Sequence, residues 1–439
     1  MAAHAKDNYL VIGGSGFLGR HIVESLLARN DTVSVFDIVQ RHHDVPFYSG
    51  DISEEGQVSD ALKKSGATCI IHTASPPHGM DDPALYWKVN VDGTKAVIAA
   101  ALANGVSKLV YTSSAGVVFN GNNIVDIDER LPPPEKAMDA YNESKAKAEE
   151  MVLEANDKGG LYTVALRPAG LFGPGDRQLI AGLYEVYENN QTHWQIGDNT
   201  NLFDWTYITN AAHAHLLAAD RLRPMSEEEV ATLKEELHYA LPYIGCTTGG
   251  RRIPTSASRP LGPYVTPPPD AEQISANWEN PDYVHARKPA VHGRFDPLSE
   301  VALVREGEKQ LQVAGQVFFI TNGEPVYFWD VPRIAWCFFD EHFGKDKTKR
   351  SVTTLSKEVG MVLAGAAEWW AWLTGKQPGF TRFRVTFSCV WRCHNIEKAR
   401  RVLGYEPQVG MEEGLKKTLE VCLLSFRWSW YSSIFCSGG

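Results

Sequence analysis

A glycine-rich segment directly after the first apolar run constrains the fold of this chain more than any other feature. Residues 9–12 have the pattern of a buried strand, and Gly13, Gly16 and Gly19 follow before an amphipathic stretch begins. Glycines at this spacing between a strand and a helix allow a tight turn and a close backbone approach to a pyrophosphate. The start of the helix then presents unpaired N–H groups to the phosphates. The segment therefore predicts a dinucleotide-binding unit.

The first two hundred residues alternate short apolar runs with helical patterns. Apolar and β-branched residues fill the runs 32–36, 69–72 and 109–112, and amphipathic or polar stretches separate them. Such alternation is typical of a parallel sheet whose two faces are covered by helices. We therefore predict an α/β fold with a Rossmann-type, doubly wound parallel sheet.

The cofactor is indicated by Asp37, which ends the second predicted strand 18 residues beyond Gly19. A carboxylate at this place accepts hydrogen bonds from the adenosine ribose and repels a 2′-phosphate. We therefore expect NAD, with NADP as the alternative because Arg41 is near. Further cofactor contacts are expected from residues that follow the third and fourth strands, namely Asp51, Ile52, Ala74 and Ser75.

Tyr141 and Lys145 are four residues apart at the start of a predicted helix, so their side chains share one face. A phenol with an ordinary pKa near 10 is a poor base at neutral pH. A nearby ammonium favours the phenolate, and the pair then suits a proton acceptor. Such pairs are common on solvated helix faces. This one gains weight from Ser114, 27 residues earlier at the end of the fifth strand, because ligands bind at the carboxyl ends of such strands.

Together these motifs resemble the extended short-chain dehydrogenase/reductase family in order and approximate spacing. The resemblance implies that Tyr141 is the general acid/base, that Lys145 binds the nicotinamide ribose and lowers the tyrosine pKa, and that Ser114 holds the substrate oxygen. It also implies cofactor contacts from Asn90 and from the loop after the sixth strand. The expected cofactor-binding residues are Gly13, Gly16, Phe17, Leu18, Gly19, Asp37, Asp51, Ile52, Ala74, Ser75, Asn90, Tyr141, Lys145, Pro168 and Ala169.

Later segments narrow the resemblance. Residues 171–176 and 203–215 look like the 3β-hydroxysteroid dehydrogenase branch, and residues 318–329 look like the decarboxylating sterol-4α-carboxylate 3-dehydrogenases of fungal ergosterol biosynthesis. This implies oxidation of the 3β-hydroxyl of a 4α-carboxysterol to a 3-keto acid that loses CO2, a C-4 demethylation. The keto acid can decarboxylate through its enol, so no metal or dedicated decarboxylating residue is expected. Arg177 is a candidate for binding the carboxylate.

The composition of the chain changes beyond Arg223. Nine of the 24 prolines fall between Pro254 and Pro297, and eight of the 12 tryptophans lie from Trp329 onward. We predict an NAD-binding domain over 7–223 with a returning strand near 316–322, a Pro-rich insertion or lid over 224–312, a smaller C-terminal substrate-binding part over 323–420, and an atypical tail over 421–439. His394 also departs from the family pattern, which usually has an aromatic residue there.

Residues 359–373 form an apolar helical pattern with Trp369, Trp370 and Trp372. Two interpretations stay open: a buried helix of the substrate-binding part, or a helix that lies at a bilayer surface. The stretch is too short and too interrupted to span a membrane. The resemblance implies peripheral attachment to the cytosolic face of the endoplasmic reticulum membrane, contacts with other sterol C-4 demethylation enzymes, and a homodimer.

Composition limits the other functions. The net charge is −10 without a basic block, which disfavours a nucleic-acid partner. The seven scattered cysteines show no paired zinc spacing, so no metal is expected. Three alternatives remain: a 3β-hydroxysteroid dehydrogenase acting on another steroid or triterpenoid, a non-catalytic cofactor-sensing regulator with the same fold, and, less favoured, a nucleotide-sugar epimerase.

Overall fold

The computed structural model describes residues 6–241, 244, 296, 298–344, 352–375 and 379–435, without the side chains of residues 424–435. Most of the insertion predicted over 224–312 therefore lies outside the described residues. Within the predicted range, the helix α8 (Glu227–Glu236) begins with a capping box between Ser226 and Glu229. After it, the short helix α10 (Glu300–Glu306) leads back to the sheet.

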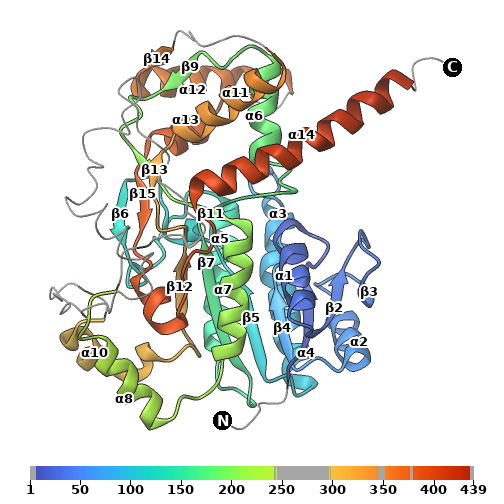
Figure 1. Ribbon diagram of the computed structural model, residues 1–439, viewed down its shortest axis with the longest axis vertical. Helices are drawn as coiled ribbons and strands as arrows, with labels where there is room; N and C mark the ends of the chain where they lie inside the picture. The colour runs from blue at the N-terminus through green and yellow to red at the C-terminus, as the bar shows by residue number, and fades with distance from the viewer. Residues whose placement is uncertain are drawn as a thin grey trace, which may run out of the picture.

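A seven-stranded parallel sheet forms the centre of the molecule (Figure 1). Its strand order is β12-β7-β5-β4-β1-β2-β3, and all six pairings are parallel. The strands are β1 (Asn8–Ile12), β2 (Thr32–Asp37), β3 (Phe47–Ser49), β4 (Cys69–His72), β5 (Lys108–Thr112), β7 (Tyr162–Pro168) and β12 (Val317–Ile320). The sheet confirms the predicted Rossmann-type α/β fold, and β12 is the strand expected near 316–322.

Helices cover both faces of this sheet. The helices α1 (Phe17–Ala28) and α7 (Ile208–Arg221) pack side by side on one face, and α2 (Glu55–Ser65), α4 (Gly93–Ala103) and α5 (Ala140–Glu154) cover the other. Each face of the sheet has its own hydrophobic core, and successive residues of β1 point into opposite cores. Val11 packs in the core with α1 and α7, whereas Leu10 packs in the core with α2 and α4. This period of two explains why each strand reads as a continuous apolar run.

The smaller part of the molecule lies beyond the carboxyl ends of the strands (Figure 1). One segment supplies β8 (Gly170–Phe172), α6 (Leu179–Glu188), β9 (Trp194–Ile196), β10 (Leu202–Phe203) and β11 (Trp205–Tyr207). The C-terminal segment supplies β13 (Val326–Tyr327), α11 (Asp330–His342), β14 (Thr353–Leu355), α12 (Lys357–Thr374), α13 (Arg382–Cys389), β15 (Arg392–His394) and α14 (Met411–Phe435). Residues 179–196 thus lie within the predicted 7–223 range but pack with the C-terminal elements.

Two features tie this smaller part together. A four-stranded sheet has the order β13-β10-β15-β6, in which β6 (Ile124–Ile127) comes from the first half of the chain. The helix α14 continues without a break through the predicted start of the tail at Val421, and Leu419, Cys422 and Leu423 pack with α6 and α11. The first residues of the predicted tail therefore belong to a core rather than to an appended segment.

Candidate active site

The glycine turn between β1 and α1 has the geometry of a phosphate cradle. Gly13 has φ +84°, and a Cβ there would lie 2.6 Å from the amide nitrogen of Ala74. A Cβ at Gly19 would lie 2.1 Å from the carbonyl oxygen of Gly13, so both positions require glycine. Gly16 caps α1 without a side-chain hydrogen bond, which leaves the N–H groups of the helix start available to an anion. Phe17 and Leu18 are the first residues of that helix.

Asp37 lies against this turn. Its Oδ2 accepts a hydrogen bond from the Ser15 N–H at 3.0 Å, and its Oδ1 accepts one from the Ile38 N–H at 2.7 Å. The carboxylate is therefore held at the end of β2, directly beside the turn. The Arg41 guanidinium donates to the Ser15 carbonyl at 3.5 Å, so a cation also borders the position. The turn, with Asp37 at its edge, fits the adenosine side of a dinucleotide.

Asp51 and Ile52 follow β3 but differ in surroundings. Lys88 Nζ lies 2.8 Å from Asp51 Oδ2, and Ser53 donates to Asp51 Oδ1. The Lys88 hydrogen bond lowers the pKa of Asp51 to about 2, so this carboxylate stays ionised. Ile52 is buried against Gly93, at the start of α4. The ion pair thus fastens the end of β3 beside the helix that carries Asn90.

Asn90 connects the cofactor side of the site to the helix of the reacting tyrosine. It lies in the π-helical segment η1 (Trp87–Asp92) and is almost fully buried. Its Nδ2 donates to Ser144 Oγ at 2.9 Å, and Ser144 Oγ donates to the Tyr141 carbonyl at 2.8 Å. Within the described part of the chain its Oδ1 has no hydrogen-bond partner. That buried acceptor suits a ligand donor, while the amide fixes the start of α5.

Tyr141, near the N-terminus of α5, reaches the carboxyl ends of β4 and β5. The side chains of Ser114 and Ser75 lie near its hydroxyl and lower the pKa of the phenol. The ring packs edge-on against His78 at 4.9 Å and Tyr86 at 5.5 Å between ring centroids. Ser75 was predicted as a cofactor contact. In the structure it also lies near the Tyr141 hydroxyl. The predicted pair of Ser114 and Tyr141 thus lies at the carboxyl end of β5, near enough for Ser114 to affect the tyrosine pKa.

Burial shapes the acidity of both reacting groups. It raises the pKa of Tyr141 to about 12, against the opposing effect of Ser114, so the phenol is protonated at neutral pH. Burial lowers the pKa of Lys145 to about 7, and the ammonium donates to the Thr112 carbonyl at 2.5 Å. Lys145 was expected to lower the pKa of Tyr141, but the pKa is raised, because the burial of the phenol is the largest effect on it. The Lys145 ammonium is instead bonded to the Thr112 carbonyl.

A buried network that no sequence motif predicted holds α5 on the sheet. Glu149 accepts a hydrogen bond from Ser113 Oγ at 2.6 Å and forms an ion pair with Arg167 at 2.6 Å, both side chains being about 4% exposed. Arg167 is the next-to-last residue of β7, which ends at Pro168, and the Ala169 N–H that follows donates to the Ile320 carbonyl of β12. The loop predicted to face the nicotinamide therefore leaves the sheet at a rigid point.

Sequence reasoning also missed the residues around the tyrosine. His78 Nε2 lies 3.1 Å from Asp139 Oδ2, and Asp139 Oδ1 caps α5 by accepting from the Asn142 N–H. On its other side, His78 contacts Phe383 of α13 at 5.4 Å. These residues come from a loop, a helix cap and a distant helix. No spacing in the sequence could have brought them together.

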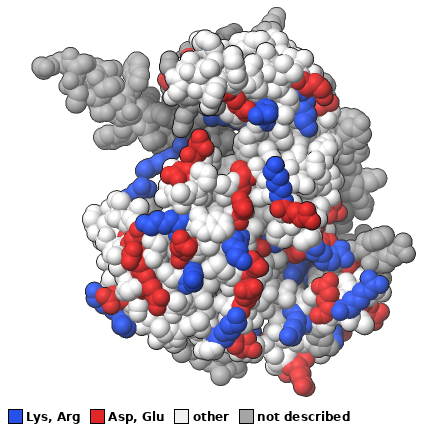
Figure 2. Space-filling model, turned by 180° about the vertical axis from the view of Figure 1, so that it is seen from behind, with Lys and Arg blue, Asp and Glu red and all other residues white. Residues whose placement is uncertain are grey.

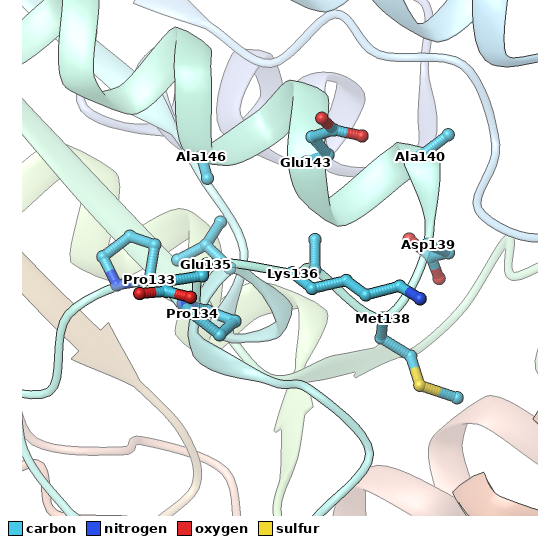
Figure 3. A pocket seen from close by; sticks show the side chains of 11 residues that line it. Pro133, Pro134, Glu135, Lys136, Met138, Asp139, Ala140, Glu143 and Ala146 are labelled. Atoms are coloured by element: carbon cyan, nitrogen blue, oxygen red, sulfur yellow. The ribbon is translucent and has the colours of Figure 1, made fainter.

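A surface pocket of about 380 Å³ borders this region at the start of α5 (Figure 3). Its lining is mixed and includes Pro133, Lys136, Met138 and Asp139. Asp139 therefore faces both this pocket and His78. Within the part of the chain that the structure describes, no group of three or more His, Cys, Asp or Glu side chains could hold a metal ion.

The sheet, the glycine turn and the contact between Tyr141 and Ser114 define an oxidoreductase of the short-chain dehydrogenase/reductase class, which uses a nicotinamide cofactor. A model of the 3-beta hydroxysteroid dehydrogenase/isomerase family matches residues 10–240, more than half of the chain. The chain belongs to this family, as its motifs predicted.

Relatives of known activity match the chain over almost its whole length. The decarboxylating sterol-4-alpha-carboxylate 3-dehydrogenases of Saccharomyces cerevisiae and Schizosaccharomyces pombe are 38% and 40% identical, each over 94% of this chain and 97% and 96% of their own. The enzyme of the same name from Mus musculus is 31% identical over 93% of this chain and 89% of its own. The match therefore includes the C-terminal elements as well as the cofactor domain.

Solved structures share the fold at low identity. The UDP-glucose 4-epimerase of Thermotoga maritima, with UDP-glucose, has a TM-score of 0.57 at 18% identity and covers 95% of this chain and 99% of its own. The UDP-glucose 4-epimerase of Thermus thermophilus, in complex with NAD, has a TM-score of 0.55 at 20% identity, covering 94% and 98%. At these identities the similarity establishes the fold alone.

Proposed function

We propose that this protein oxidises the 3β-hydroxyl of a 4α-carboxysterol with a nicotinamide cofactor, and that the resulting 3-keto acid loses CO2. The observation that carries the proposal is the position of the half-buried Tyr141, whose hydroxyl lies near Ser114 at the strand ends beside the glycine turn. The near full-length similarity to sterol-4-alpha-carboxylate 3-dehydrogenases supports the choice of substrate. This is the C-4 demethylation step expected from the sequence.

The roles of the residues follow from their contacts. Ser114 orients the substrate hydroxyl, and Tyr141 in its phenolate form accepts the hydroxyl proton. A bound nicotinamide would supply the acceptor for the hydride that leaves C3. Because the pKa of Tyr141 is about 12, proton transfer needs a nearby positive charge. Lys145, one helical turn away on α5, would supply this charge in its protonated form. The ketone formed at C3 is β to the carboxylate, so the C4–CO2 bond breaks with its electron pair entering an enolate that solvent protonates.

The other candidate functions are less well supported. A cofactor-sensing regulator has no need for a tyrosine whose hydroxyl lies near Ser114. A nucleotide-sugar epimerase shares the fold, but here Phe383 contacts His78, the neighbour of the tyrosine, and Phe387 stacks on Phe383, which suits a flat apolar ligand. A 3β-hydroxysteroid dehydrogenase acting without decarboxylation differs in substrate alone and remains the alternative within the family.

We propose NAD as the cofactor. The Asp37 carboxylate stands beside the glycine turn, where it accepts from the Ser15 N–H. In this position it can accept from a ribose diol and repel a 2′-phosphate. Arg41 contacts the Ser15 carbonyl from the other side and is the group that would allow residual use of NADP.

We also propose that α12 attaches the protein to the cytosolic surface of the endoplasmic reticulum membrane. The buried residues of this helix are small, namely Gly360, Ala364 and Ala371. The exposed large side chains of the helix are apolar and between 48% and 76% exposed, and they are Val359, Val362, Leu363, Trp369, Trp370, Trp372 and Leu373. Large apolar side chains that point outward at helical spacing need a cover, and indole rings suit the boundary between headgroups and acyl chains.

The surroundings of α12 favour a bilayer as that cover. The helix packs on α13, whose Phe383 contacts His78 beside the reacting tyrosine, so a sterol leaving the bilayer has a short apolar route to the site. The end of the molecule that carries these helices is largely uncharged in Figure 2, whereas acidic and basic residues intermingle elsewhere on that face. No helix among the described residues is long and apolar enough to cross a membrane.

Replacing Tyr141 by Phe should lower turnover of a 4α-carboxysterol by roughly 10²-fold or more, the usual scale for a lost general base. Binding of NADH, followed by its fluorescence, should stay nearly unchanged. Tyr86→Phe is the matched control, because its ring packs on Tyr141 while its hydroxyl donates to the Pro77 carbonyl at 2.6 Å. Near-normal turnover by the Tyr141 variant would exclude the assigned role.

Replacing Asp37 by Ala should shift cofactor preference toward NADP, because a repulsive charge and a ribose acceptor are both lost. We expect the ratio of kcat/KM for NAD over NADP to fall by about tenfold or more. Asp37→Asn keeps an acceptor for the Ser15 N–H but removes the charge, so it should lose most of the discrimination as well. An unchanged ratio in both variants contradicts the assignment.

Replacing Trp369 and Trp370 together by Ser should release the protein from liposomes that contain anionic lipid. Each large apolar side chain transferred from water contributes roughly 1.5–3 kcal/mol. Both are more than 60% exposed, so the thermal stability and the activity on detergent-solubilised substrate should be retained. Trp87→Ser, which alters a 44% exposed tryptophan on the cofactor domain, is the control. Unaltered flotation of the double variant with liposomes would show that α12 is not the attachment site.

A further inference from the structure

Arg392 is buried in an aromatic box within the smaller part of the molecule. It lies on β15, an inner strand of the four-stranded sheet, opposite Phe203 of β10. The residue is 8% exposed. Its guanidinium carbon lies 4.4 Å from the ring centroid of Phe119, 5.2 Å from that of Phe203 and 5.0 Å from that of Phe387.

The guanidinium has no anionic partner among the described residues. No hydrogen bond or ion pair of its side chain is found there, and its Nε is fully buried without a partner. The two nearest carboxylates already have other donors. Asp139 accepts from the Asn142 N–H and pairs with His78, and Asp204 accepts from both the main chain and the ring of His394.

An unpaired buried charge is costly, and cation–π contacts compensate for only part of the lost hydration. Burial lowers the pKa of Arg392 to about 10, so the side chain is still charged at neutral pH. A planar guanidinium presents donors that match a carboxylate in a bidentate way. The box therefore lacks one component, an anion that enters together with apolar surface.

The box is continuous with the reacting residues. A chain of ring contacts leads from the box to the tyrosine. The distances between ring centroids are 5.8 Å for Phe387 and Phe383, 5.4 Å for Phe383 and His78, and 4.9 Å for His78 and Tyr141. Phe119 follows the 3-10 turn η2 (Ala115–Val118), which begins directly after Ser114. Asp139, the first of the charged neighbours that act on Arg392, caps the helix of Tyr141. The helix α13, the turn η2 and the cap of α5 thus connect the surroundings of the guanidinium with the surroundings of Tyr141 and Ser114.

We propose that Arg392 binds the carboxylate of the substrate, while the half-buried rings of Phe383 and Phe387 contact its flat apolar ring system. The proposal rests on the proposed function and identifies the group that selects acidic sterols. It replaces Arg177, the candidate from the sequence, which is solvent-exposed and lies outside this box. Loss of CO2 removes the partner of the guanidinium, so the neutral ketone is held less strongly than the acid.

Equilibrium binding tests the proposal without requiring turnover. The probes are a 4α-carboxy-3β-hydroxysterol and its methyl ester, each titrated in detergent into the enzyme saturated with NADH, so that oxidation cannot proceed. The wild-type protein should bind the acid at least tenfold more tightly than the ester, since the ester cannot form the charged pair. Arg392→Gln should abolish this difference while leaving the affinity for the ester unchanged. Arg392→Lys should keep part of the difference, because it retains the charge but loses the bidentate fork.

Arg177→Gln is the control and should keep the full preference for the acid. The proposal is overturned if the wild-type protein does not distinguish acid from ester, if Arg392→Gln still does, or if Arg392→Gln weakens both ligands equally, which would make Arg392 a packing residue. The protein could also prefer the acid to the ester through Arg392 but oxidise neither sterol. That result would support the carboxylate site and contradict the proposed function. The two claims therefore fail separately.

Discussion

The Glu149 carboxylate ties three elements together, and the geometry of the site depends on it. It accepts from Ser113 at the end of β5 and pairs with Arg167 at the end of β7, while its own helix α5 carries Tyr141 and Lys145. Both charged side chains are about 4% exposed, so removing either partner would leave an uncompensated charge and cost roughly 3–5 kcal/mol. Because the pair is bidentate and buried, it also fixes how α5 lies on the sheet.

From that anchor the remaining contacts follow in order. Lys145 is drawn to the Thr112 carbonyl, one residue before Ser113, and Tyr141 then meets Ser114 one residue after it. Asn90 donates to Ser144 of the same helix, so the position of α5 is also fixed relative to the cofactor side of the site. The reacting tyrosine is thus placed by three elements of the cofactor domain, whereas Arg392, Phe383 and Phe387 come from the smaller part. This division allows one fold to serve sugar epimerases and sterol enzymes alike.

Local patterns in the sequence were enough to predict the cofactor domain. The glycine turn, the apolar runs and the spacing of Tyr141 and Lys145 each involve residues close in the chain. Each of these patterns is compatible with only a few local structures. The apolar stripe of 359–373 was visible too, but its direction was not, because a stripe of large residues normally faces a core. In α12 the small residues Gly360, Ala364 and Ala371 face inward instead. The acidity of Tyr141 was also beyond the sequence, since desolvation depends on the whole surrounding fold.

Long-range convergence explains the rest of what the sequence could not predict. Arg392 is one arginine among 43 basic residues, and its importance appears only when Phe119, Phe203 and Phe387 are seen around it. The central claim, an oxidation coupled to decarboxylation, is tested most directly by incubating the wild-type protein with a 4α-carboxysterol and NAD while following NADH and CO2 together. The account predicts that the two appear in equal amounts. NADH without CO2, or neither product, would contradict it.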